Sequence, residues 1–163
     1  MDVKIIMVPL DGSELAERAL APAAELARDA SATLVLVRAT EAPVMYGADP
    51  TEAQVTVVRE AEVYLDKQAR RLRREGVARV ETSVWYGPAA PSLVEAARRR
   101  KVDLIVMSSH GRSGLGRLVL GSVAESVLRA TTTSILLVRA PSAPVETPAR
   151  TAEPREAKET LHA

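Results

Sequence analysis

The sequence contains no cysteine and no phenylalanine in 163 residues, and it has only one tryptophan and three tyrosines. Without cysteine the chain cannot form disulfides, thiolate zinc sites or a cysteine nucleophile, and this composition is typical of a reducing compartment. With so few aromatic rings, a surface that stacks on nucleic-acid bases is not expected. The apolar residues are instead mainly alanine, valine, leucine and isoleucine, which suit helices packed on a parallel sheet.

The chain also lacks an excess of either charge and any long apolar run. Lysine and arginine number 22, and aspartate and glutamate number 21, which leaves a net charge of +1. This balance provides no general attraction to nucleic acid or to a membrane surface, and we expect neither as a partner. The N-terminal apolar segment is too short for a signal peptide, and no later run reaches the ~18 residues of a membrane span. We therefore expect a cytoplasmic protein with one main domain.

Apolar residues form segments that are alternately strand-like and helix-like. The strand candidates are short apolar runs bounded by turn residues, whereas the helix candidates carry apolar residues near helical spacing. Pro22 predicts a kink in the first helix, because proline lacks a backbone donor. Strands are predicted at Lys4–Leu10, Ala32–Thr40, Val77–Gly87, Val102–Ser108 and Ser134–Arg139, and helices at Glu14–Ala30, Thr51–Gly76, Pro91–Lys101 and Ser122–Ala130.

This order of elements predicts an α/β fold that is Rossmann-like, with an open five-stranded parallel sheet and helices on both faces. The third strand alternates enough to lie near an edge of the sheet. The domain is predicted to span residues 1–140. Residues 141–163 are rich in proline and mixed charge and offer little apolar area to bury, so they are predicted to form a disordered tail. Deletion of Ala143–Ala163 is expected to leave folding and ligand binding nearly unchanged.

A glycine-rich stretch, Met107–Ser122, follows the fourth predicted strand and reads MSSHGRSGLGRLVLGS. It fails as a Walker A loop, because Ser122 stands where a lysine is required. It also fails as a dinucleotide-binding GxGxxG motif, because Val119 stands at the third glycine and the motif belongs after a first strand. A P-loop NTPase is therefore excluded, and a dinucleotide enzyme is not expected.

Two interpretations of this stretch remain open from the residues alone. Its backbone amides can converge on a phosphate at the start of the Ser122 helix, where unpaired amides carry partial positive charge. Alternatively, Ser122 and Glu125 form a capping box that satisfies the same amides internally. Position favours a ligand, because this stretch and Asp11 both follow the carboxyl ends of strands, where ligands of open α/β sheets collect.

The motifs PLDGS after the first strand and SSHGRSGLGRLVLGSVAESVLRATTTSILLVR resemble the universal stress protein family. ATP-binding members of that family carry glycine, two residues, glycine, nine residues, then glycine and serine or threonine. Here Gly111, Gly121 and Ser122 match this pattern, whereas Ser108 replaces the first glycine. The resemblance extends over about Met1 to Arg139 and implies the adenine nucleotide alpha hydrolase-like form of the fold.

The resemblance implies an ATP site, with magnesium accompanying the nucleotide, in the cleft at the carboxyl ends of strands one, two and four. Asp11 would accept hydrogen bonds from ribose hydroxyls, and the Ala39 backbone would bind the adenine edge. Arg112 flanks the glycine loop and could reach a phosphate. The implied binding residues are Pro9, Leu10, Asp11, Ala39, Ser108, His110, Gly111, Arg112, Ser113, Gly114, Gly121, Ser122 and Val123.

Simpler roles for some of these residues stay open. Asp11 is equally suited to start a turn or to cap the first helix. His110 has no second ligand at metal-binding spacing, so a metal site is not expected. The arginine-rich runs that begin at Arg70 and Arg98 are interpreted as solvated helix ends rather than as anion sites.

The preferred hypothesis is a nucleotide-dependent stress-response or signalling module that is not an enzyme. The alternatives are a nucleotide-independent interaction protein on the same fold and, with less support, a slow ATP hydrolase, for which no general base is evident. The last strand, Ser134–Arg139, is apolar on both faces and is expected to pair with a second copy in a homodimer.

Overall fold

The computed structural model describes residues 2–43, 47, 49–109 and 120–139. The five strands form one parallel sheet in the order β3-β2-β1-β4-β5. The predicted Rossmann-like α/β fold is therefore confirmed. The predicted tail, residues 141–163, lies outside the described residues. The strands are β1 (Ile5–Pro9), β2 (Thr33–Thr40), β3 (Val80–Tyr86), β4 (Leu104–Ser108) and β5 (Ser134–Val138).

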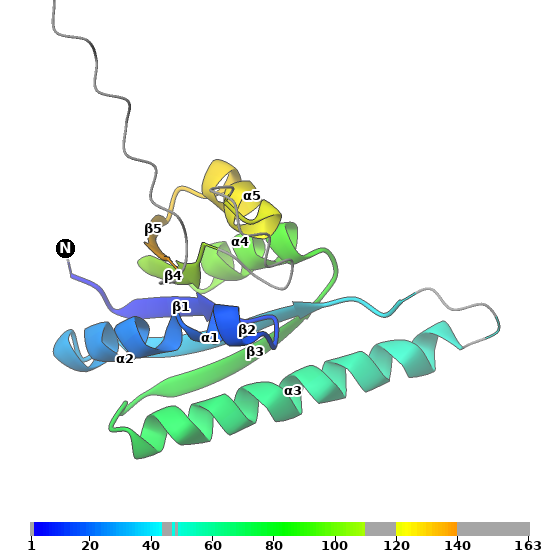
Figure 1. Cartoon of the computed structure of the whole chain (residues 1–163), viewed down its shortest axis with the longest axis horizontal. Coiled ribbons are helices and arrows are strands. Elements are labelled where there is room, and N and C mark those ends of the chain that lie inside the picture. The colour runs from blue at the N-terminus through cyan, green and yellow to red at the C-terminus, as the bar shows by residue number, and fades with distance from the viewer. Residues whose placement is uncertain (1, 44–46, 48, 110–119, 140–163) are drawn as a thin grey trace, which may run out of the picture.

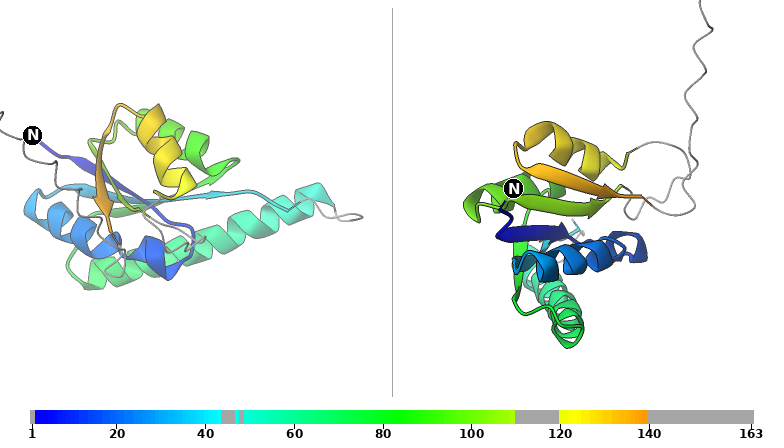
Figure 2. Two further views of the ribbon diagram at one scale, coloured as in Figure 1. Left: turned by 45° about the horizontal axis from the view of Figure 1, so that its top comes forward. Right: turned by 90° about the vertical axis from the view of Figure 1, so that its left-hand side faces the viewer.

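Helices cover both faces of this sheet. In the right-hand view of Figure 2, α5 lies on one side of the sheet and α2 and α3 lie on the other. Within the described parts of the chain, no helix is long and apolar enough to cross a membrane. The helices are α1 (Glu14–Glu17), α2 (Leu20–Asp29), α3 (Pro50–Arg74), α4 (Ala89–Arg99) and α5 (Ser122–Ala130).

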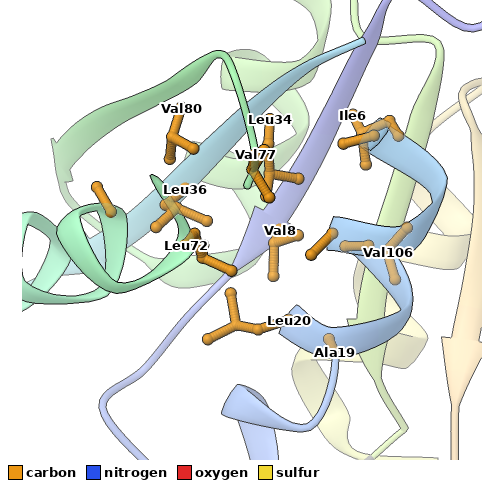
Figure 3. Close-up of a cluster of buried hydrophobic side chains, with 14 of the residues drawn as sticks. Ile6, Val8, Ala19, Leu20, Leu34, Leu36, Leu72, Val77, Val80 and Val106 are labelled. Atoms are coloured by element: carbon orange, nitrogen blue, oxygen red, sulfur yellow. The ribbon is translucent and has the colours of Figure 1, made fainter. Parts of the chain in front are cut away.

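Each face of the sheet has its own apolar core, because successive side chains of a strand point to opposite faces. On the face of α1, α2 and α3, Val8, Leu36 and Val106 pack with helix residues such as Leu20 (Figure 3). On the opposite face, Met7, Val35, Val37, Ile105 and Met107 pack against α4 and α5. Alternation along β1, β2 and β4 therefore assigns each side chain to one of two cores.

The first predicted helix is divided into α1 and α2, and Pro22 explains the division. Pro22 lies in the first turn of α2, where its missing N–H is not needed. It has no N–H to donate to the carbonyl of Arg18, and its ring crowds that carbonyl. The chain accordingly turns at Arg18 and Ala19, before the proline rather than at it. The four-residue α1 is thus a separate helix (Figure 1).

Three helices end in the same Schellman motif, in which two amides beyond the helix bond back to its last carbonyls. After α3, Gly76 N–H donates to Arg73 and Val77 N–H donates to Leu72. The residue after the cap has positive φ in each case: Ser31 after α2 (φ 50°), Gly76 after α3 (φ 90°) and Lys101 after α4 (φ 51°). Only Gly76 was predicted as such a terminator.

These motifs also explain why the third and fourth strands begin later than predicted. Val77 and Val102 are buried, and each donates its N–H to the helix that precedes it. They are therefore the apolar residues that seal a helix end rather than the first residues of a strand. The sequence cannot separate the two roles here, because a buried valine suits both.

Candidate functional site

A pocket of about 270 Å³ lies at the carboxyl edge of the sheet. It lies where the strand order reverses between β1 and β4, which is the usual ligand position in open α/β sheets. Residues from the ends of β1, β2 and β4, from α1, and from the N-terminal parts of α4 and α5 line it. They are Pro9, Leu10, Asp11, Ala16, Ala39, Ala89, Leu93, Met107, Ser108, Gly121, Ser122, Val123 and Ala124.

Asp11 organises the turn that leads from β1 to α1. Its Oδ1 accepts hydrogen bonds from Ser13 N–H at 2.9 Å and from Ser13 Oγ at 2.6 Å. Ser13 in turn is the N-cap of α1, and its Oγ accepts from Ala16 N–H at 3.1 Å. Gly12, with φ 86°, allows the chain to turn between them. Asp11 therefore does start a turn, as one of the open interpretations held, and it also lines the pocket.

The backbone of Ala39 faces the pocket for a reason set by strand alternation. Val37 C=O accepts from Leu10 N–H at 2.8 Å, so Val37 points its backbone groups toward β1. Ala39 is two residues further along β2 and points the same way, but β1 ends at Pro9. Its N–H and C=O therefore lie beyond the strand that would have paired with them. A donor and an acceptor side by side suit the edge of a nucleobase.

The start of α5 presents backbone amides to the same pocket. Gly121 is the N-cap, and no side chain of the described residues caps the helix. Gly121 N–H donates to Ser109 C=O at 2.8 Å, whereas the amides of Ser122, Val123 and Ala124 precede the first intrahelical bond. Ser122, Val123 and Ala124 line the pocket. This arrangement offers converging donors and the positive end of a helix dipole to an anion.

The capping box that we had left open, with Ser122 as N-cap, is wrong. The helix begins one residue earlier than that motif requires, so Gly121 is the N-cap and Ser122 is already the first helical residue. Glu125 donates its N–H to Gly121 C=O, and its side chain binds Arg129 at 2.8 Å rather than turning back to the helix start. The helix amides are therefore not satisfied in the way that the capping box would have satisfied them.

Ser108, which replaces the first glycine of the family pattern, is the last residue of β4. It is buried, it lines the pocket, and its φ is not positive. Serine at this position therefore imposes no left-handed backbone strain. The next residue, Ser109, donates its N–H to Val138 C=O at 2.9 Å and accepts from Gly121, so it joins the end of β5 to the start of α5.

Eight of the residues predicted for the site line this one pocket: Pro9, Leu10, Asp11, Ala39, Ser108, Gly121, Ser122 and Val123. His110, Gly111, Arg112, Ser113 and Gly114 lie outside the described residues, so their part in the site stays a prediction. Five further lining residues were not predicted: Ala16, Ala89, Leu93, Met107 and Ala124. No motif marks Ala89 and Leu93 of α4, and only the helix start after β3 could have suggested that they reach this edge.

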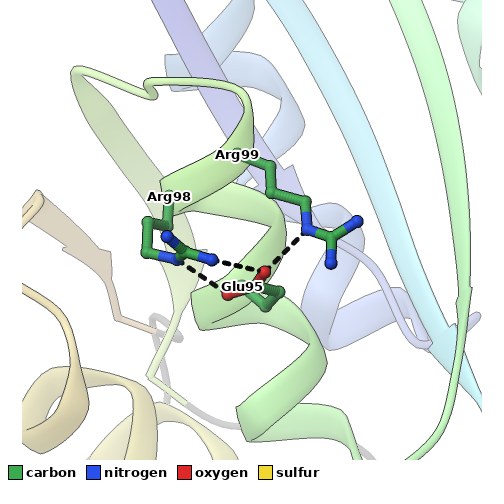
Figure 4. Close-up of polar contacts among 3 residues, drawn as sticks. All are labelled: Glu95, Arg98 and Arg99. Atoms are coloured by element: carbon green, nitrogen blue, oxygen red, sulfur yellow. Dashed lines mark hydrogen bonds and ion pairs between the residues drawn. The ribbon is translucent and has the colours of Figure 1, made fainter.

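The arginine run at the end of α4 is occupied by ion pairs. Arg98 and Arg99 bind Glu95 at 2.7 Å and 2.6 Å (Figure 4), and Arg100 binds Glu81 at 2.6 Å. Hydrogen bonds from the two arginines lower the pKa of Glu95 to about 2. The described residues contain no group of three or more acidic or histidine side chains that could hold a metal ion. In the described residues, therefore, neither this arginine run nor a cluster of metal ligands offers an alternative to the pocket as the ligand site.

Comparison with known proteins identifies the family of this chain. A model of the universal stress protein family matches residues 2–139. A universal stress protein of Methanocaldococcus jannaschii is 30% identical over 142 residues, which cover 85% of this chain and 83% of that protein. A solved structure of a family protein from Burkholderia pseudomallei is 32% identical, has a TM-score of 0.68, and is matched over 85% of this chain and 98% of its own.

Two other similar structures contain nucleotides. A universal stress protein in complex with cAMP has a TM-score of 0.67 and 24% identity over 85% of this chain and 98% of its own. A universal stress protein from Archaeoglobus fulgidus in complex with dAMP has a TM-score of 0.62 and 24% identity over 84% of this chain and 98% of its own. At these identities the two structures establish likeness of fold.

Proposed function

Because this chain belongs to the universal stress protein family, we propose that it is a nucleotide-dependent stress-response or signalling module that binds ATP in the pocket described above. The observation that carries the proposal is the convergence of three different donor and acceptor sets on one pocket. The Ala39 backbone suits a base, the Asp11 carboxylate suits ribose hydroxyls, and the start of α5 suits phosphate.

The shape of the pocket supports a nucleoside. Pro9, Leu10, Ala39, Leu93 and Met107 provide apolar walls on which a planar base can lie. The volume of about 270 Å³ is close to the lower end of small-molecule sites, which begin at about 300 Å³. The structures with cAMP and dAMP show that this fold accommodates adenine nucleotides in other proteins.

The preference for ATP over other adenine nucleotides rests on the glycine pattern of Gly111, Gly121 and Ser122. We propose that the triphosphate extends from the amides of α5 toward this loop, and that magnesium accompanies the phosphates. The described acidic residues of the pocket do not form a metal-binding group. The cation would therefore depend mainly on phosphate oxygens and water, as magnesium commonly does.

We propose binding rather than catalysis as the activity. Asp11 is the acidic residue that lines the pocket, and its Oδ1 already accepts two hydrogen bonds from Ser13. These bonds give the carboxylate a structural role, holding the turn from β1 to α1, that accounts for it without a part in catalysis. Steady-state phosphate release from ATP tests this part, and turnover above the rate of a Gly121→Val variant would contradict it.

Native mass spectrometry of freshly purified protein, followed by calorimetry with Mg-ATP, tests the binding itself. We expect co-purified ATP or ADP, or a measurable heat with added nucleotide. GTP is the matched control, because its base edge reverses the donor and acceptor positions that Ala39 would contact. No nucleotide and no heat at millimolar Mg-ATP would favour a nucleotide-independent interaction protein.

We also propose a homodimer through β5, because the two sheet edges differ. The backbone groups of Val80 face outward from β3, and Arg73 donates to its carbonyl. β5 carries no charge between Ser134 and Val138, and Leu136 is 39% exposed. An apolar edge without such protection favours pairing with a second copy.

A further inference from the structure

The side chain of Tyr64, on α3, contacts Glu17 of α1 and Arg38 of β2, which lie close in sequence to Asp11 and Ala39 of the proposed nucleoside site. Its hydroxyl donates to Glu17 Oε1 on α1 at 2.8 Å. Its ring lies under the guanidinium of Arg38 on β2, whose carbon is 5.1 Å from the ring centroid. Arg38 immediately precedes Ala39, and Glu17 ends the short helix that follows Asp11. One side chain thus joins the two segments that would hold the base and the ribose.

The α1 segment needs such support, because it is too short to be stable by itself. A four-residue helix forms barely one turn, and isolated helices of this length do not persist in water. Its first turn is fixed by Ser13, which is itself bound to Asp11. The last residue, Glu17, is fixed from α3. Movement at Glu17 is therefore transmitted through one helical turn to the Asp11 carboxylate.

The contacts to Glu17 form a compact polar cluster at the α1–α3 interface. Gln68, which is 5% exposed, also donates to Glu17 Oε1 at 2.8 Å. Arg71 approaches the other carboxylate oxygen at 3.9 Å. Burial, and then the hydrogen bond to Glu17, raise the pKa of Tyr64 above its usual range, so the hydroxyl stays protonated as a donor. A partly buried glutamate with these partners favours one geometry, since a change would leave the buried amide of Gln68 without its acceptor.

We infer that Tyr64 is a positioning residue of the nucleotide site: it holds Asp11, through Glu17 and α1, at the distance from Ala39 that a nucleoside requires. This inference rests on the proposed function, because it assigns Asp11 to the ribose. It adds a residue from α3, an element that does not line the pocket. No motif includes Tyr64 or Glu17, which lie 47 residues apart.

Tyr64→Phe removes the hydroxyl and keeps the ring beneath Arg38. Calorimetry should compare ATP with 2′,3′-dideoxy-ATP for the natural protein and the variant. We expect the affinity for ATP to fall about five- to tenfold and the affinity for the dideoxy compound to change little, so that discrimination between the two is lost. An equal loss for both nucleotides would indicate a merely structural role and would overturn the inference.

Tyr86→Phe is the matched control. The Tyr86 hydroxyl accepts a long bond from Ala42 N–H at 3.5 Å, in the segment that follows β2, rather than bonding to Glu17. The ratio of the affinities for ATP and 2′,3′-dideoxy-ATP in Tyr86→Phe should match the ratio in the natural protein. A Glu17→Gln, Tyr64→Phe double-mutant cycle should show coupling between the two changes, whereas additive effects on ATP affinity would count against a shared path.

Hydrogen exchange of the α1 amides separates failure of this inference from failure of the proposed function. Exchange at Ala16 and Glu17 should become faster in Tyr64→Phe, with unchanged rates in the strands. Unchanged α1 exchange overturns the inference whether or not nucleotide binds. If α1 exchange responds but the natural protein binds no ATP, the proposed function fails and the ligand role of Tyr64 fails with it.

Discussion

At the scale of single residues, Ser108 and Gly121 show what the glycines of the family pattern contribute to the pocket. The family pattern has glycine at both positions, yet neither backbone needs positive φ: Ser108 lies in β4, and Gly121 has φ −56° and ψ 143°. Glycine is therefore not required there for conformational freedom. The remaining reason for glycine at either position is that a side chain there occupies space in the pocket.

We expect Gly121→Val to abolish or strongly weaken Mg-ATP binding. Valine adds a branched side chain at the pocket wall beside the amides of Ser122 and Val123, and it is a poor N-cap. Its effect on stability should stay near 1 kcal/mol, because the backbone conformation is accessible to valine. Calorimetry measures the affinity. Ser108→Gly is the comparison and should bind Mg-ATP as tightly as the natural protein or more tightly. If Gly121→Val bound Mg-ATP with the affinity of the natural protein, the phosphates would have to lie elsewhere.

At the scale of elements, the helix ends make a prediction about stability. Lys101 adopts φ 51° in the Schellman motif after α4, and Gly76 occupies the equivalent position after α3. Lys101→Gly should raise the free energy of unfolding by about 0.5–1 kcal/mol, because glycine relieves the left-handed strain. Gly76→Ala should lower it by about 1 kcal/mol, although the space around Gly76 is open. Urea denaturation measures both, and changes of the same sign would contradict the argument.

Asp103 joins the start of β4 to the start of β1. Its Oδ2 accepts from Lys4 N–H and Ile5 N–H, both at 2.9 Å, and these backbone bonds lower the pKa of Asp103. A carboxylate whose pKa is lower in the folded than in the unfolded protein stabilises the fold above its unfolded pKa. That stabilisation is lost as the pH falls through the folded pKa. The Asp103→Asn variant should therefore be less stable than the natural protein at pH 7, whereas the two should differ little in stability at pH 2.

Thermal unfolding across this pH range is the measurement. The difference in melting temperature between the natural protein and Asp103→Asn should narrow as the pH falls below the unfolded pKa of aspartate. Asp2→Asn is the control, because Asp2 pairs only with the exposed Lys4 side chain at 3.3 Å and such pairs contribute little. A difference that stays constant from pH 7 to pH 2 would show that ionisation is not involved.

The elements were more predictable than their ends. Short apolar runs between helical segments identified the five strands, and the edge position of β3 followed from its alternation. Local patterns did not reveal that Ser31 and Lys101 adopt positive φ, because tertiary packing of Ala32 and Val102 enforces that geometry. They also did not reveal the Tyr64–Glu17 contact, because neither residue belongs to a periodic or local signal.

At the scale of the whole molecule, the assembly prediction can be made specific. Val138 C=O accepts from the N–H of Ser109, the residue after β4, so the backbone groups of Val138 face β4 and those of Leu137 face the outer edge of β5. Leu137→Pro removes an outward donor without breaking the β4–β5 ladder. We expect light scattering to give a dimer for the natural protein and a monomer for the variant. Val84→Pro on β3 is the control for the opposite edge and should remain dimeric. A natural protein that is monomeric at micromolar concentration would refute the dimer.

The strand order has a consequence for how the chain folds. β1 is made first but occupies the centre of the sheet, and the hydrogen bond from Ile5 N–H to Asp103, the residue before β4, spans 98 residues. Contacts this distant in sequence close late, because a long loop must first be ordered. The pocket needs Asp11 and Ala39 from the early half and Ser108 and Gly121 from the late half. In time-resolved refolding, competence to bind nucleotide should therefore appear only with the final docking of β4, after most helical signal has returned.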